Sequence, residues 1–261
     1  MTAQTITVVG ARGGSGTSTI AAAAALFAAR IVATELVARD VDSAAAMLGL
    51  SAPGDSDVPM DVAERLTLAS VPTGSASVAV IDAGRLDQFD HRPTGLLLVV
   101  LRGPCYLGLR SIVNRELRPD GIVVLSETGR SLTLRDVQDV CGVPVVAQVH
   151  VSAHVARTID AGLLVTRSPA LRELAGLHQY VDTLVSVTNP VAMSRRRHPS
   201  ARSPQPFATT LPSPSSVSAS VDPSTRTARP KIGTDMPLPL SGSSRAFPSC
   251  RDSGIARAIP S

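Results

Sequence analysis

The chain has 261 residues, of which 44% are hydrophobic, 18% charged and only 2% aromatic. This length suits one domain with a core of Ala, Val and Leu, and the scarcity of aromatic side chains argues against stacking platforms for single-stranded nucleic acid. The formal net charge is +4, but residues 194–261 hold ten Lys and Arg against three Asp, so residues 1–193 are mildly acidic. Any binding of nucleic acid is therefore expected to be weak and to come from the basic tail alone.

Three cysteines form neither a CxxC pair nor a disulfide framework, and the five histidines show no zinc-ligand spacing with them. The N-terminus lacks the basic segment that opens a signal peptide. The longest apolar runs, such as residues 20–29, are shorter than the ~18 residues that a membrane span requires. Together these features predict a soluble, cytoplasmic protein.

Strand and helix patterns alternate through the first 190 residues. In chain order they predict a strand at 5–10, a glycine-rich turn at 13–16, a helix at 18–29, strands at 35–38, 77–82 and 95–101, a helix at 106–117, a strand at 121–126, a helix at 132–140, a strand at 143–149, and helices at 152–164 and 169–185. Repeated strand–helix units of this kind form a mostly parallel sheet with helices on both faces.

The composition changes after Met193. Residues 194–261 contain 15 Ser and 11 Pro in 68 positions and show no apolar periodicity. Such a segment cannot bury enough apolar surface to offset the entropy lost on ordering. We therefore predict an α/β domain over residues 1–190 and a disordered tail over residues 191–261. The tail is either a basic tether for an acidic partner or a linker without a selected sequence.

The sharpest local feature is a strand, a glycine-rich turn and a helix start in direct succession, with four glycines between residues 10 and 16. Glycines let backbone N–H groups approach an anion closely, and a helix N-terminus adds positive potential. The segment therefore predicts a phosphate-binding loop. The alternative is a tight strand-to-helix turn that binds nothing.

One family with such a loop is the short-chain dehydrogenases, because Gly10-x-x-x-Gly14-x-Gly16 fits their pattern for binding NAD(P). These enzymes also need a Lys four residues after a Tyr, since the Lys lowers the pKa of the Tyr that transfers the proton. Tyr106 is followed at this spacing by Arg110, Tyr180 by Leu184, and residues 1–193 contain no lysine. Active dehydrogenase chemistry is therefore not expected, although NAD(P) binding stays open as an alternative.

A second family matches more of the chain. Residues 12–19, Arg-Gly-Gly-Ser-Gly-Thr-Ser-Thr, resemble the deviant Walker A motif of the ParA/MinD group of P-loop ATPases, which reads Lys-Gly-Gly-x-Gly-Lys-[Ser/Thr]-Thr. Residues 39–42 resemble the family's Asp-x-Asp, residues 80–84 its Walker B strand, and residues 149–162 a late strand-to-helix segment. The resemblance spans residues 4–188 in the family's order. Residues 101–109 are similar to MinD-like proteins found near tight-adherence pilus genes.

The resemblance implies a P-loop fold, ATP and Mg²⁺ as ligands, and a role in subcellular positioning or assembly of the pilus, secretion, septum or partitioning type. It also implies a nucleotide-dependent homodimer and a protein partner from such a system. No transmembrane segment is expected.

The family's site residues carry over by position. Asp42 matches the residue that orients the attacking water, Asp40 accompanies it, and Arg12 stands where the family has a signature lysine that reaches the nucleotide. Ser18 and Asp82 match the Mg²⁺ ligands. The nucleotide-binding residues implied are Arg12, Gly13, Gly14, Ser15, Gly16, Thr17, Ser18 and Thr19. The structural alternatives are a helix cap for Thr17 or Ser18 and a turn for the two aspartates after residue 39.

Two departures from the motif bear on catalysis. Thr17 replaces the P-loop lysine that neutralises charge at the β- and γ-phosphates, and Arg12 keeps the charge of the signature lysine but not its geometry. Ser126 and Glu127 stand where many relatives have an Asn that reads adenine, so the base preference is left open. The substitutions predict nucleotide binding with impaired or absent hydrolysis. The alternative is a slow but genuine ATPase that uses Arg12.

Overall fold

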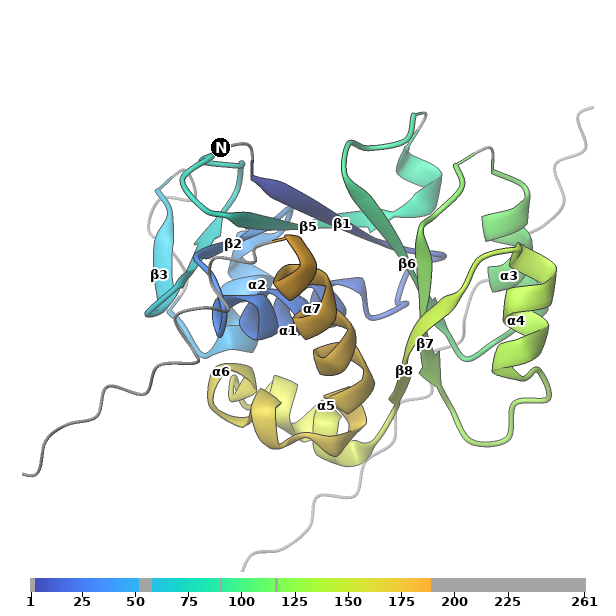
Figure 1. Ribbon diagram of the computed structural model, residues 1–261. Helices are drawn as coiled ribbons and strands as arrows, with labels where there is room; N and C mark the ends of the chain where they lie inside the picture. The colour runs from blue at the N-terminus through green and yellow to red at the C-terminus, as the bar shows by residue number, and fades with distance from the viewer. Residues whose placement is uncertain (1–2, 52–57, 90, 116, 189–261) are drawn as a thin grey trace, which may run out of the picture. The chain divides into compact units, whose positions relative to one another are not determined.

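The computed structural model describes residues 3–51, 58–89, 91–115 and 117–188 (Figure 1). The predicted tail, residues 191–261, lies outside these residues. The described part contains strands β1 (Gln4–Gly10), β2 (Thr34–Ala38), β3 (Met60–Ala63), β4 (Leu66–Ala69), β5 (Val78–Arg85), β6 (Leu96–Arg102), β7 (Gly121–Ser126) and β8 (Val145–His150). Its α-helices are α1 (Thr17–Ala29), α2 (Val41–Leu48), α3 (Tyr106–Val113), α4 (Leu134–Cys141), α5 (Ala153–Asp160), α6 (Leu164–Arg167) and α7 (Ala175–Thr188).

The eight strands form one sheet in the order β3-β4-β2-β5-β1-β6-β7-β8, and every pair except β3–β4 is parallel. The predicted α/β class and mostly parallel sheet are therefore confirmed. The order also separates this sheet from the dinucleotide-binding arrangement, in which the first two strands are neighbours. Here β5 lies between β1 and β2, so the sheet expected for an NAD(P)-binding protein is not formed.

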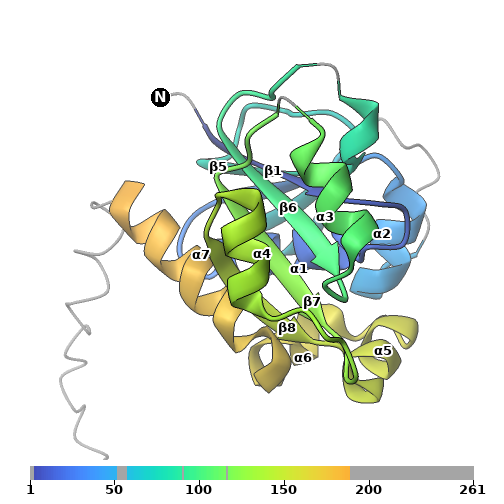
Figure 2. The ribbon, with the colours of Figure 1, turned by 90° about the vertical axis from the view of Figure 1, so that its right-hand side faces the viewer.

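Helices cover both faces of the sheet (Figures 1 and 2). On one face, α1, α2 and α5–α7 enclose a core of Ala, Val and Leu side chains, and residues 21–25 of α1, all alanine, are fully buried. On the other face, α3 and α4 lie over β6 and β7 around a second, smaller core. Alanine allows the central helix to be buried on all sides because its short side chain lets neighbouring elements approach closely.

Three helices are shorter than their sequence patterns suggest. The helix expected at 106–117 ends at Val113, and its C-cap Asn114 donates its backbone N–H to the Arg110 carbonyl at 3.0 Å. The helix expected at 152–164 divides into α5 and α6 at Gly162, whose φ of 65° is easily adopted only by glycine. The helix expected at 169–185 begins only at Ala175, after two short 3₁₀ turns.

Two features were not predicted. Helix α2 follows Asp40, and no helix is predicted there from the sequence, because only its first two residues belong to the Asp-x-Asp resemblance. The β3–β4 hairpin is joined by Glu64 and Arg65, which carry no glycine or asparagine turn signal, and β4 is held by parallel pairing with β2. Among the described residues, no helix is long and apolar enough to cross a membrane.

Candidate functional site

The candidate site lies at the carboxyl edge of the central strands. Strand β1 runs between β5 and β6, and the segment from Ala11 to Gly16 links it to α1. Asp82 of β5 pairs with Val8 of β1, so it lies one strand from the start of this loop. In open parallel sheets this edge is where ligands bind.

Glycines and one serine shape the loop. Gly14 and Gly16 have φ angles of 73° and 80°, a region that L side chains rarely adopt. The Ser15 hydroxyl donates to the Arg12 carbonyl at 2.6 Å and accepts from the Arg12 amide at 3.2 Å. The nearly buried serine therefore holds the two sides of the loop together.

The amides of the loop and of the first helical turn are left without acceptors. Gly16 caps α1 in left-handed conformation with no side-chain hydrogen bond, so the expected cap by Thr17 or Ser18 is wrong. Within the described chain, the N–H groups of residues 13–19 donate to no carbonyl or side chain. A Cβ added at Gly14 would meet nothing within 4 Å. Unpaired donors at a helix N-terminus beside open space form an arrangement that suits an anion.

Thr17 occupies the space beneath the loop. Its side chain is nearly buried, and its Oγ1 lies 2.5 Å from where a Cβ on Gly10 would be. The same Cβ would lie 2.9 Å from the Arg12 carbonyl oxygen, which explains why only glycine fits at position 10. A side chain at position 17 thus runs under the loop from the helix side.

Asp82 and Ser18 are the residues that the sequence predicts as ligands of a hard cation. Asp82 is 7% exposed, lies in the middle of β5, and its Oδ1 accepts a hydrogen bond from the Gly84 amide at 3.3 Å. Ser18 is exposed in the first turn of α1. Carboxylate and hydroxyl oxygens are ligands that Mg²⁺ accepts together with phosphate oxygens. No group of three or more His, Cys, Asp or Glu in the described residues forms a metal cluster by itself.

The aspartates after β2 have different surroundings. Asp40 is the N-cap of α2, and its two carboxylate oxygens accept from the Ser43 amide at 3.0 Å and the Ser43 hydroxyl at 2.6 Å. These bonds, the hydroxyl first, lower the pKa of Asp40. Asp42 is exposed in the first turn of the same helix. Asp40 therefore caps a helix and does not form the turn expected as the alternative, while Asp42 has no hydrogen bond to the loop among the described residues.

Comparisons with known proteins identify the fold of the chain. No protein-family model and no curated protein sequence matches the chain. MinD in a MinC:MinD complex from Aquifex aeolicus superposes with a TM-score of 0.60 at 14% identity, over 70% of this chain and 96% of that chain. MinD with Mg-ADP from Pyrococcus horikoshii OT3 gives 0.57 at 15% identity, over 73% and 98%. A ParA family ATPase from Chlorobium tepidum TLS gives 0.52 at 15% identity, over 70% and 98%.

The chain has the ParA/MinD fold. At these identities the likeness concerns the fold. Any nucleotide binding or hydrolysis by this chain therefore has to be argued from the residues of its own loop.

Sequence reasoning missed one cation beside the loop of this ParA/MinD fold. Arg102, the last residue of β6, donates from Nη1 to the Gly14 carbonyl at 3.4 Å and from Nε to Glu127 at 2.8 Å. Arg130 also binds Glu127, and hydrogen bonds from Arg130 and then Arg102 lower the pKa of this carboxylate. The sequence contained a signal for this residue. Arg102 follows the strand predicted at 95–101, and parallel strands end at the same edge of a sheet, which is also the edge of the loop.

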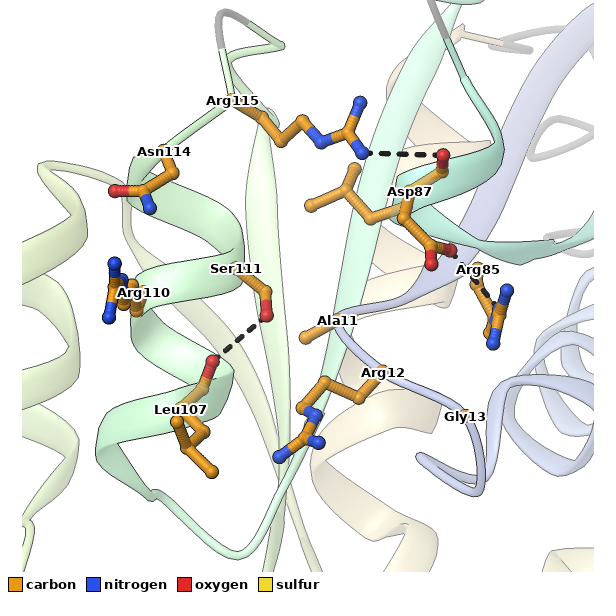
Figure 3. A pocket seen from close by; sticks show the side chains of 11 residues that line it. Ala11, Arg12, Gly13, Arg85, Asp87, Leu107, Arg110, Ser111, Asn114 and Arg115 are labelled. Atoms are coloured by element: carbon orange, nitrogen blue, oxygen red, sulfur yellow. Dashed lines mark hydrogen bonds and ion pairs between the residues drawn. The ribbon is translucent and has the colours of Figure 1, made fainter. Parts of the chain in front are cut away.

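The residues in place of the family's asparagine are also engaged. Ser126 Oγ lies 3.0 Å from His150 Nδ1 and accepts from Gln148 Nε2 at 3.0 Å, while Glu127 holds the two arginines described above. Neither side chain has an amide, so this edge carries a hydroxyl and a carboxylate where the family has an asparagine amide. Arg12 is exposed and its side chain extends on the α3 side of the loop (Figure 3).

Proposed function

We propose that this chain is a ParA/MinD-like nucleotide-binding protein that holds the phosphates of ATP on residues 12–19. The observation that carries the proposal is the set of unpaired amides at the uncapped start of α1. These donors are preorganised by Ser15 and by the left-handed glycines, so binding requires little ordering of the backbone. The open space beside Gly14 leaves room for a phosphate to approach them.

Mg²⁺ fits the same proposal. Ser18 in the first turn of α1 and Asp82 in β5 would hold it with the phosphates, and the ion would neutralise phosphate charge there. Fold neighbours include MinD complexed with Mg-ADP and a McdA–ATP complex. Both support nucleotide as the ligand class for this chain.

Hydrolysis is proposed to be impaired, because Thr17 provides no charge where the motif has lysine. A slow ATPase is the second candidate. The positions of two arginines, Arg12 and Arg102, favour it. Arg102 reaches the Gly14 carbonyl, so a guanidinium already lies at the loop. Arginine differs from lysine in geometry, so either arginine would stabilise transferring phosphate less directly.

In the cell, we propose a role in positioning or assembly, with a nucleotide-dependent homodimer and a protein partner of a pilus, secretion, septum or partitioning system. The MinC:MinD neighbour, a complex of cell division proteins, supports a partner-binding role. The MinD-like segment at residues 101–109 is the basis for the pilus alternative.

Calorimetry of the full chain with ATP, ADP and NADP⁺, each with Mg²⁺, tests the proposal. We expect heat of binding for ATP and ADP and none for NADP⁺. Tight NADP⁺ binding without ATP binding would show that the loop serves a different class of ligand.

The loop itself is tested with a matched pair of glycine variants. Gly14 and Gly74 have φ angles of 73° and 72°, and a Cβ at either meets nothing within 4 Å. Gly14→Ala and Gly74→Ala should therefore lose similar stability, about 1 kcal/mol each, from the strained backbone. We expect only Gly14→Ala to weaken ATP binding, by about tenfold or more, because it alters the amide directions. Equal ATP affinity in the two variants would remove the loop from the site.

A further inference from the structure

A cavity of about 520 Å³ lies beside the loop, on the face of the sheet that carries α3 (Figure 3). Three segments enclose it: the start of the loop at residues 11–13, the end of β5 with the following 3₁₀ turn, and α3 with the residues after it. The amides of residues 14–18 do not line it. The cavity is therefore a neighbour of the proposed phosphate site and not its interior.

Four arginines and a single acid line this cavity: Arg12, Arg85, Arg110, Arg115 and Asp87. The Arg85 Nε meets the Asp87 carboxylate at 3.1 Å, and Arg115 donates to the backbone carbonyls of Asp87 at 3.3 Å and Phe89 at 3.4 Å. Asp87 thus offsets one positive charge, and three remain around a small volume. Their mutual repulsion is relieved when an anion enters.

Two of these cations have no protein partner in the described part of the chain. Neither the Arg12 nor the Arg110 side chain makes a hydrogen bond or ion pair there, and both residues are exposed. Guanidinium groups in this state keep all their donors for an incoming carboxylate or phosphate. Figure 3 shows that Arg12 comes from the loop and Arg110 from α3, so two different segments supply these cations.

Apolar side chains stand at the same place. Leu107, which lines the cavity, is 53% exposed, and its neighbour Tyr106 is 70% exposed. Helix α3 begins at Tyr106 with no side-chain cap and no acid in its first turn, which adds positive potential. Arginines that line a cavity, with an exposed tyrosine next to a lining residue in the sequence, match the composition of protein-binding hot spots. A free phosphate would gain nothing from the leucine and the tyrosine.

We propose that this cavity docks an acidic segment of a partner protein, with two or more carboxylates for Arg110 and Arg12 and an apolar side chain for Leu107 and Tyr106. The proposal goes beyond nucleotide binding and does not depend on it, although Arg12 borders both sites. The partner segment is expected to be acidic because the cavity is lined by arginines, and to carry an apolar side chain because Leu107 is exposed.

The test uses the full chain and a fluorescein-labelled peptide, Gly-Asp-Glu-Leu-Asp-Glu-Leu-Asp-Gly-amide, with fluorescence anisotropy as the readout. Arg110→Ala and Leu107→Ser should each weaken binding by about fivefold or more. Arg135→Ala is the matched control, because it removes the same charge from an 88% exposed side chain on α4. Affinity should be unchanged in this control. Thermal melts establish that each variant is folded.

Three outcomes would overturn the proposal. Equal weakening by Arg110→Ala and Arg135→Ala would show attraction to net charge alone. Unchanged affinity in Leu107→Ser, together with displacement of the peptide by inorganic tripolyphosphate in the Gly14→Ala background, would show a small-anion site. Absence of peptide binding to the wild type would show no site at all. Peptide binding retained in Gly14→Ala supports the proposal and separates it from nucleotide binding.

Discussion

Thr17 occupies the position at which the related motif has a lysine, and its side chain runs beneath the loop toward Gly10. Thr17 is the first residue of α1 and is 9% exposed. The side chain at this position carries no charge where the related motif has one. A single substitution at position 17 can therefore test whether the missing charge limits ATP hydrolysis.

Thr17→Lys should raise Mg²⁺-dependent phosphate release above that of the wild type, because a compact charge would then lie where negative charge develops. Thr17→Lys combined with Asp42→Ala should stay inactive. Phosphate release by these variants, Arg12→Ala and Arg102→Ala is the measurement. Robust wild-type turnover that disappears in Arg12→Ala or Arg102→Ala would instead favour the slow-ATPase candidate.

Thr7 shows how an orphaned polar group affects stability. It is 1% exposed on β1, and its hydroxyl has no hydrogen-bond partner in the described residues. We expect Thr7→Val to stabilise the fold by about 1 kcal/mol, because the change removes an unsatisfied buried group and keeps the shape. Urea unfolding measures the free energy.

The matched control for Thr7 is Thr34, equally buried on β2 but with its hydroxyl bonded to the Val32 carbonyl at 3.1 Å. Thr34→Val should destabilise the protein, since it leaves that carbonyl with one partner fewer. If both substitutions changed stability in the same direction, side-chain size and not hydrogen bonding would be the cause.

At the scale of single elements, α1 and α2 begin in opposite ways. Helix α1 starts at a left-handed glycine with no side-chain cap, whereas α2 has a complete cap from Asp40. A capped helix end satisfies its own amides, and an uncapped one keeps them for a ligand. The contrast supports α1, and not α2, as the proposed anion site.

The α2 cap gives stability a pH dependence. Because hydrogen bonds from Ser43 lower the folded-state pKa of Asp40 below its usual value of 3.8, the cap contributes fully above that value. Its contribution is lost as the pH falls through the lowered pKa. Asp40→Ala should cost about 1 kcal/mol at pH 7, and the difference from wild type should shrink below about pH 4.

Asp40→Asn serves as the control for this effect, because asparagine caps a helix without a titrating group. It should keep the neutral-pH stability and lose the acid-dependent part. Urea unfolding at pH 7 and near pH 3 measures both. A difference between Asp40→Ala and wild type that persists unchanged into acid would mean that the carboxylate charge is not involved.

At the scale of the whole molecule, the described residues form a sheet whose two faces are used differently. One face carries α1 and the Ala-rich core, and the other carries α3, α4 and the arginine-lined cavity (Figure 2). The loop stands between them at the sheet edge. A ligand on the loop and a partner in the cavity would therefore approach from neighbouring directions.

The predicted tail is tested by deletion. A chain ending at Met193 should melt within about 2 °C of the full-length protein, since a segment without packed contacts adds little stability. Thermal melts followed by circular dichroism measure this. A clear fall in melting temperature on truncation would show that residues 194–261 pack against the rest.

The sequence by itself determined the α/β class, most strands and the glycine loop. These depend on local signals: a β-branched run between residues 5 and 10, glycines that can adopt positive φ, and an alanine run that suits a buried helix. It did not yield α2 or the β3–β4 hairpin, because a short capped helix and a turn without glycine give weak local signals.

The tertiary structure decided which segments meet. The placement of β5 and β6 on either side of β1 brought Asp82 and Arg102 to the loop, and no spacing along the chain encodes that order. The arginine-lined cavity likewise joins side chains from three distant segments. Strand pairing is a long-range property, so which of the residues at this edge lie beside the loop could be assigned only once the sheet was assembled.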